Sequence, residues 1–139
     1  MADPQDSLSL IIEPETLQPH LNDEKLLVID LGKEADYLQA HVPGALFLPY
    51  QALLPGTPPA PGKLPDLEQL NKTFGYLGLT PDTHVVAYDD EGGGWAGRLI
   101  WTLDVIGHRK YSYLNGGIHA WKDANLTTES GQNQPRSRS

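Results

Sequence analysis

The sequence contains no cysteine among its 139 residues. A chain without thiols has no disulfide, no thiolate metal ligand and no cysteine nucleophile. Basic residues are also few, with ten Lys and Arg against 18 Asp and Glu, which gives a formal net charge of -8. Because this charge disfavours binding to nucleic acid or to an anionic membrane surface, we expect neither as a partner.

Long hydrophobic runs are absent as well. No segment approaches the roughly 20 apolar residues that span a bilayer. The N-terminus, Met1-Ala-Asp-Pro-Gln-Asp6, has no basic segment followed by an apolar stretch, so no export signal is indicated and a cytoplasmic location is expected. Apolar residues still make up 39% of the chain, which together with its length suits one folded domain.

Apolar runs of strand length alternate with helical patterns along the chain. The spacing predicts strands over 8–12, 26–30, 45–48, 84–88 and 111–114, and helices over 13–21, 33–42, 66–77, 95–106 and 118–124. The continuous run Leu26-Leu-Val-Ile-Asp30 is typical of a strand buried on both faces. The alternation predicts an α/β fold with a mainly parallel sheet.

Two predicted helices carry a recognisable apolar face. In the helix over 33–42 this face consists of Ala35, Leu38 and Val42. In the helix over 95–106 it consists of Leu99, Leu103 and Ile106. This spacing favours a helix in both segments.

Two segments lack either pattern. Between Leu54 and Pro65 there are five prolines and two glycines, which predict a surface loop. The residues from Glu129 onward are polar and resemble a linker. We therefore divide the chain into a tail over 1–9, a domain over 10–126 and a polar tail or interdomain linker over 127–139.

The loop after Tyr88 is where chemistry is expected, because open parallel sheets bind ligands beyond the carboxyl ends of their strands. Gly92, Gly93 and Gly94 allow backbone N–H groups to converge, and the following helix adds about half a positive charge, so the loop resembles an anion nest. Asp89, Asp90 and Glu91 stand beside it. Like charge at about 4 to 6 Å opposes an external phosphate.

Cofactor and metal sites find little support in the sequence. Gly92, Gly94 and Gly97 spell G-x-G-x-x-G, but Leu114-Asn-Gly-Gly117 stands where a dinucleotide site needs its acidic partner. A metal held by the three loop acids would need further oxygen ligands from elsewhere. The five histidines lie on different predicted elements without paired ligand spacing. We therefore predict no cofactor and no metal.

Several segments together resemble a rhodanese domain. They are Val28-Ile-Asp30 followed by His41-Val-Pro-Gly-Ala45, Val85-Val-Ala-Tyr88 with its loop, Gly107-His108, and Leu114-Asn-Gly-Gly-Ile-His-Ala-Trp121. The resemblance covers about Leu10 to Leu126. It implies a central, mainly parallel five-stranded sheet with helices on both faces, and a loop after the fourth strand that begins with a cysteine. That cysteine takes a sulfane sulfur from thiosulfate or another donor, holds it as a persulfide among the loop amides, and passes it to cyanide or a thiol.

The sequence departs from this pattern at one position, because Asp89 stands where the cysteine is expected. A carboxylate cannot form a persulfide. The chain therefore resembles the non-catalytic N-terminal repeat of a bacterial tandem-domain thiosulfate sulfurtransferase, with no catalytic residue of its own and with a cysteine-bearing second repeat as its partner. Two alternatives stay open: a stand-alone inactive module for regulation or protein binding, and an enzyme that uses Asp89 as base or nucleophile.

Individual residues of this region leave further alternatives. Asp89 is either an internal anion in the place of the persulfide or an ordinary helix cap or solvated loop residue. The resemblance implies that Trp95 lines the interface between repeats, so we expect it to be more exposed than Trp101 and Trp121. Arg98 belongs to the same predicted interface, and either pairs with the loop acids or covers the helix surface. At their turns, His41 and His108 are expected to bond to backbone or carboxylate groups.

Overall fold

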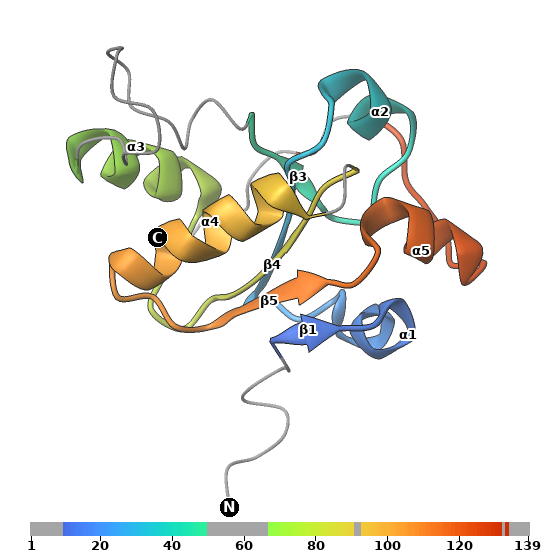
Figure 1. Ribbon diagram of the computed structural model, residues 1–139, viewed down its shortest axis with the longest axis horizontal. Helices are drawn as coiled ribbons and strands as arrows, with labels where there is room; N and C mark the ends of the chain where they lie inside the picture. The colour runs from blue at the N-terminus through green and yellow to red at the C-terminus, as the bar shows by residue number, and fades with distance from the viewer. Residues whose placement is uncertain (1–9, 50–66, 91–92, 132, 134–139) are drawn as a thin grey trace, which may run out of the picture.

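The computed structural model describes residues 10–49, 67–90, 93–131 and 133 (Figure 1). Its elements are β1 (Ile11–Ile12), α1 (Pro14–Leu17), the 3-10 helix η1 (Gln18–His20), β2 (Leu26–Asp30), α2 (Glu34–Gln39), β3 (Leu46–Phe47), α3 (Leu67–Leu77), β4 (His84–Tyr88), α4 (Gly94–Val105), β5 (Tyr111–Leu114) and α5 (Gly117–Asp123). The predicted alternation of strands and helices is therefore confirmed. The predicted loop between Leu54 and Pro65 lies outside the described residues.

The five strands form one sheet in the order β1-β5-β4-β2-β3. Every pairing between these described strands is parallel, which confirms the predicted sheet type. The two central strands pair from Leu26 with His84 to Asp30 with Tyr88. Their carboxyl ends therefore meet at the same edge of the sheet, where the loop after Tyr88 begins.

Helices cover both faces of the sheet. On one face α3 and α4 pack against Leu27, Ile29, Val85 and Ala87; on the other, α1, α2 and α5 pack against Leu26, Val28, Val86 and Tyr88. Figure 1 shows α4 crossing in front of β4 and β5. Because alternate residues of a strand point to opposite faces, this two-sided burial explains why β2 is apolar throughout until Asp30.

Helix α2 differs from its prediction. It ends at Gln39, since Ala40 is extended (φ -162°, ψ 130°). The predicted apolar face is wrong in part: Ala35 and Leu38 are exposed, and Tyr37 is the buried residue of the helix. Tyr37 fills the core because its hydroxyl donates a 2.7 Å hydrogen bond to the Ala45 carbonyl, which satisfies its polar end.

Helix α4 follows its prediction except at the end. Leu99 and Leu103 are fully buried, as the periodicity predicts. Ile106 is 38% exposed, because it is the C-cap residue and Gly107, at a φ of +90°, turns the chain away directly after it. The helix thus presents its Leu99 and Leu103 side to the sheet and ends before Ile106.

The described residues after α5 lie against α2 and the turn that precedes β3. Glu129 and His41 exchange backbone hydrogen bonds of 2.8 and 2.9 Å. His41 Nε2 lies 3.1 Å from the Glu129 carboxylate, and Nδ1 lies 2.8 Å from the Tyr37 carbonyl. The Asn133 amide donates to the Ala45 carbonyl at 3.0 Å. His41 therefore bonds to backbone and carboxylate groups, as predicted.

Candidate functional site

The Asp89 carboxylate lies in a cradle of backbone amides. Asp89 follows β4 directly and is only 3% exposed. Gly93 N–H donates to Oδ1 at 2.8 Å, and the N–H groups of Trp95 and Ala96 donate to Oδ2 at 3.0 Å each. A buried carboxylate with these donors is not a solvated loop residue. It caps the first turn of α4 and is at the same time an internal anion, so these two interpretations describe one arrangement.

Glycines on both sides of the cradle permit its geometry. Gly93 has a φ of +101°, and a Cβ there would come within 2.9 Å of the Tyr113 hydroxyl oxygen. Gly117 has a φ of +58°, and a Cβ there would collide with the Asp89 carbonyl oxygen. The sequence marked Asn115-Gly-Gly117 only as a turn. The structure adds that Gly117 lets this turn lie directly against the Asp89 backbone.

Two further carboxyl groups lie beside the cradle. Asp30, at the end of β2, is 4% exposed and accepts a 2.7 Å hydrogen bond from Gly32 N–H. Burial, with a smaller contribution from the charge of Asp90, raises the pKa of Asp30 to about 6 against the lowering effect of the hydrogen bonds from Gly32 and Tyr88. In the sequence, Asp30 stands out as the acidic residue at the end of an apolar strand.

Asp90 lies beside Gly32, next to Asp30. A Cβ at Gly32 would come within about 3.0 Å of the Asp90 side chain and 3.1 Å of Asp30 Oδ1. Asp90 Oδ2 accepts from Lys33 N–H at 3.4 Å, while Oδ1 is buried without a hydrogen-bond donor. The edge of the sheet beside the cradle is therefore acidic, which disfavours a multiply charged anion there.

The three tryptophans are not exposed in the predicted order. Trp95 is half-buried and packs against the α3 and α4 side of the core. Trp101 is 45% exposed and Trp121 is fully buried. The expectation that Trp95 would be the most exposed is therefore wrong. The hydrogen bond from Trp95 N–H to Asp89 fixes the start of α4 such that the Trp95 ring turns toward the core.

Arg98 lies on the α4 surface, with its guanidinium carbon 4.8 Å from the centre of the Trp101 ring. This contact places the Arg98 side chain along its own helix. Gly94 is exposed at the start of the helix. Glu91 and Gly92, which belong to the predicted loop site, lie outside the described residues.

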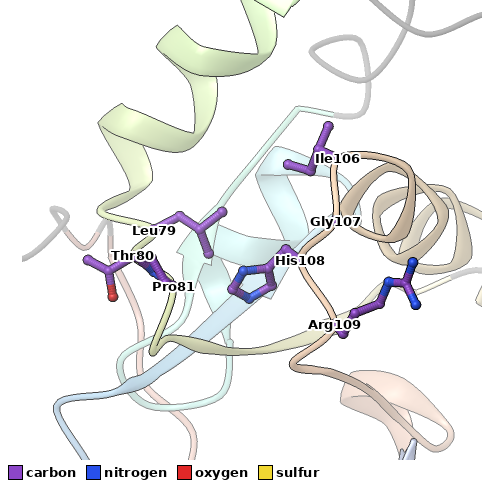
Figure 2. A pocket seen from close by; sticks show the side chains of 7 residues that line it. All are labelled: Leu79, Thr80, Pro81, Ile106, Gly107, His108 and Arg109. Carbon is purple, nitrogen blue, oxygen red and sulfur yellow. The ribbon is translucent and has the colours of Figure 1, made fainter.

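A groove of about 350 Å³ lies at the opposite end of the sheet (Figure 2). It is formed by the turn before β4 and the turn between α4 and β5, and its lining consists of Leu79, Thr80, Pro81, Ile106, Gly107, His108 and Arg109. His108 Nε2 donates to the Thr83 carbonyl at 2.8 Å, which confirms the predicted backbone bond. The groove shares no residue with the Asp89 cradle.

Within the described ranges, no three His, Asp or Glu side chains are grouped so that they could hold a metal ion. None of the helices in that part of the chain has the length and apolar character that crossing a membrane requires.

Comparison with known proteins places the cradle in a family context. The rhodanese-like domain family matches residues 13–124. A thiosulfate sulfurtransferase of Azotobacter vinelandii is 53% identical over 115 residues, which cover 83% of this chain and 42% of that protein. A 3-mercaptopyruvate sulfurtransferase of Escherichia coli is 32% identical and is covered to 48%. The chain thus spans less than half the length of these relatives.

Solved structures agree in fold. The crystal structure of an Escherichia coli 3-mercaptopyruvate sulfotransferase superposes with a TM-score of 0.81 at 30% identity, covering 92% of this chain and 53% of that one. A protein from Anabaena sp. has a TM-score of 0.62 at 20% identity, and 81% of its chain is covered. The same fold therefore also occurs in a solved chain that is little longer than the matched region.

Proposed function

Because this chain belongs to the rhodanese-like domain family, we propose that it is the catalytically silent N-terminal repeat of a thiosulfate sulfurtransferase. Its sulfur-carrying cysteine then lies in a second repeat outside these 139 residues. The cytoplasmic location expected from the sequence is part of this proposal.

The observation that carries the proposal is the Asp89 carboxylate in its amide cradle. A sulfane sulfur is carried by a thiolate, and the chain has no cysteine at this position or any other. The three amides that would surround a persulfide instead bind the Asp89 oxygens at 2.8 to 3.0 Å. The cradle is thus filled by the chain's own negative charge.

The surroundings of the cradle also oppose sulfur transfer from thiosulfate. Thiosulfate is a dianion, and Asp30 and Asp90, which lie close together at Gly32, make this edge of the sheet acidic. Although burial raises the pKa of Asp30 to about 6, most of this group is ionised at neutral pH and adds a further negative charge. For the same reason, we expect Asp89→Cys to restore little activity, because acidic neighbours raise a thiol pKa and repel the donor.

The length of the relatives supports the tandem arrangement. The chain accounts for 42% of a thiosulfate sulfurtransferase to which it is 53% identical, so that protein contains more than this chain's length of additional sequence. A second repeat fits in that length. The names of the relatives suggest thiosulfate as the sulfur donor of the parent protein.

A stand-alone inactive module is the second candidate, favoured by the Anabaena structure, whose chain is 81% covered by this one. The coding sequence beyond Ser139 discriminates between the two. A following repeat with cysteine in the loop after its fourth strand supports the tandem enzyme. A stop codon directly after Ser139 supports the stand-alone module.

The activity test uses the purified 139-residue chain with thiosulfate and cyanide. We expect thiocyanate formation no faster than with heat-inactivated protein, whereas the parent protein should be active under the same conditions. Thiocyanate produced by the 139-residue chain above that background would contradict the proposal. It would then favour an enzyme acting through Asp89.

A further inference from the structure

One side of α4 is exposed along its whole length. Gly94, Gly97, Trp101 and Val105 are exposed and follow one another at spacings of three or four residues, so they share a side of the helix. The buried residues Ala96, Leu99, Thr102 and Leu103 face the protein interior. We call the exposed side, with Arg98, the outer face of α4.

The outer face of α4 and the residue that follows it expose three large apolar side chains close together in the sequence. Trp101 is 45% exposed and Val105 is 53% exposed, and Ile106 directly after the helix is 38% exposed. The other large apolar side chains that are exposed in the described part of the chain are on α2, α3, β1 and the residue before β1. Single exposed apolar residues are ordinary, whereas a tryptophan among neighbouring apolar residues is typical of an interaction surface.

Arg98 and the two glycines give the outer face a shape suited to a partner. The guanidinium of Arg98 lies over the Trp101 ring at 4.8 Å, and Trp and Arg are the residue types most often found at the energetic centres of interfaces. A Cβ on Gly94 or Gly97 would meet no atom within 4 Å. The first two turns of α4 therefore leave their backbone open to close approach, and these turns adjoin the Asp89 cradle.

We infer that the outer face of α4 is the surface on which the second, cysteine-bearing repeat docks, with Trp101 rather than Trp95 as its anchor. This inference rests on the proposed function. The relatives named above contain more than this chain's length of additional sequence, and a same-chain domain interface buries on the order of 600 to 1,500 Å². The occupant would offer an apolar surface against which Trp101 and Val105 can pack.

Hydroxyl-radical footprinting of the full-length parent protein tests the inference, because it reports the solvent exposure of individual side chains. Each oxidation rate is normalised to that of the urea-unfolded protein. Tyr76, which is 61% exposed on α3, is the matched exposed control, and Trp121 is the buried reference. In the parent protein we expect Trp101 to react at least five-fold more slowly than in the 139-residue chain, close to the rate of Trp121, while Tyr76 is unchanged.

A variant gives a second readout. Because Trp101 is exposed, Trp101→Ala should leave the melting temperature of the 139-residue chain nearly unchanged. In the parent protein the same change should loosen the contact between repeats, so that limited proteolysis between them becomes at least several-fold faster. Tyr76→Ala in the parent protein is the control and should leave the cleavage rate unchanged.

The outcomes separate this inference from the proposed function. If an active parent protein with a cysteine-bearing repeat leaves Trp101 as reactive as Tyr76, the docking surface is wrong and the proposed function stands. If the coding sequence contains no such repeat, the proposed function fails and the inference fails with it. If Trp101 becomes protected in the 139-residue chain as its concentration rises, the occupant is a second copy, which also overturns the inference.

Discussion

Replacing Asp89 with alanine tests whether the carboxylate organises the loop. The substitution removes the acceptor for the N–H groups of Gly93, Trp95 and Ala96, which bond to it within 3.0 Å. Hydrogen bonds to a charged group contribute about 1.5 to 3 kcal/mol each, and water can replace part of what is lost. We therefore expect Asp89→Ala to lower the free energy of unfolding by about 3 to 5 kcal/mol, a large share of the roughly 5 to 15 kcal/mol typical of a domain.

The assay is urea unfolding at pH 7, with Asp89→Asn and Asp82→Ala as comparisons. Asparagine retains one carbonyl oxygen, so it should lose about half as much as alanine. Asp82 is an exposed residue of the turn before β4, and its replacement should change stability by less than about 0.5 kcal/mol. A loss at Asp89→Ala as small as that of Asp82→Ala would refute the cradle as an energetic feature.

Added formate should partly restore the Asp89→Ala variant, because it can supply the missing carboxylate to the same three amides. At ten times its dissociation constant, formate would stabilise the variant by about 1.4 kcal/mol. Chloride at equal ionic strength is the control, and the unsubstituted chain should not respond. Thiosulfate should restore less than formate, since its second charge is opposed by Asp30 and Asp90. If formate and chloride stabilised the Asp89→Ala variant equally, the three amides would not form a carboxylate-binding cradle in that variant.

Three further predictions concern the surroundings of the site. Gly117→Ala should destabilise the chain by more than about 2 kcal/mol in urea unfolding, because its Cβ would collide with the Asp89 carbonyl, whereas Gly131→Ala, with open space around it, should cost less. Burial raises the pKa of Asp30 to about 6 in the folded chain, above its value in the unfolded chain, so the free energy of unfolding should fall by up to about 3 kcal/mol as pH rises from about 4 to 6. Asp30→Asn should flatten this slope in unfolding curves recorded across the same pH range. Hydrogen bonds from Asn133 and Gly44 lower the pKa of Glu129, so the contact of residues 127–131 with α2 should be lost on acidification through this lowered pKa. Hydrogen exchange should show that loss, and Glu129→Gln should remove its pH dependence.

The sheet could be predicted from the sequence because each of its long strands is an apolar run, and a parallel sheet covered on both faces requires such runs. The apolar face of α2 could not be predicted from the sequence in this way. Its periodicity pointed to Leu38, but Tyr37 occupies the core because its hydroxyl donates a hydrogen bond to the Ala45 carbonyl. That carbonyl belongs to the turn before β3, and a pattern within one helix carries no information about acceptors on another segment.

The exposure of the tryptophans is a different kind of error. The periodicity correctly placed Leu99 and Leu103 on the apolar side of the helix, and Trp101 lies about 200° around the helix from each of them. Its exposure therefore followed from a prediction already made. The partial burial of Trp95 followed from the same periodicity, because Trp95 lies four residues before Leu99 and so on the same side of the helix. The sequence did not reveal the positive φ of Gly93 or the hydrogen bond from Trp95 N–H to Asp89, which fix the start of the helix.

The residue at position 89 accounts for the shape of the loop. The donors of the cradle belong to the backbone, so they need an acceptor whichever side chain is present. Glycine or alanine would leave them unsatisfied in a buried place, at about 1 to 3 kcal/mol for each group. Aspartate supplies two oxygens at the required distance and cannot carry a sulfane sulfur. The same carboxylate therefore organises the loop and the start of α4, and in the proposed function it stands where a sulfur-carrying thiolate would be.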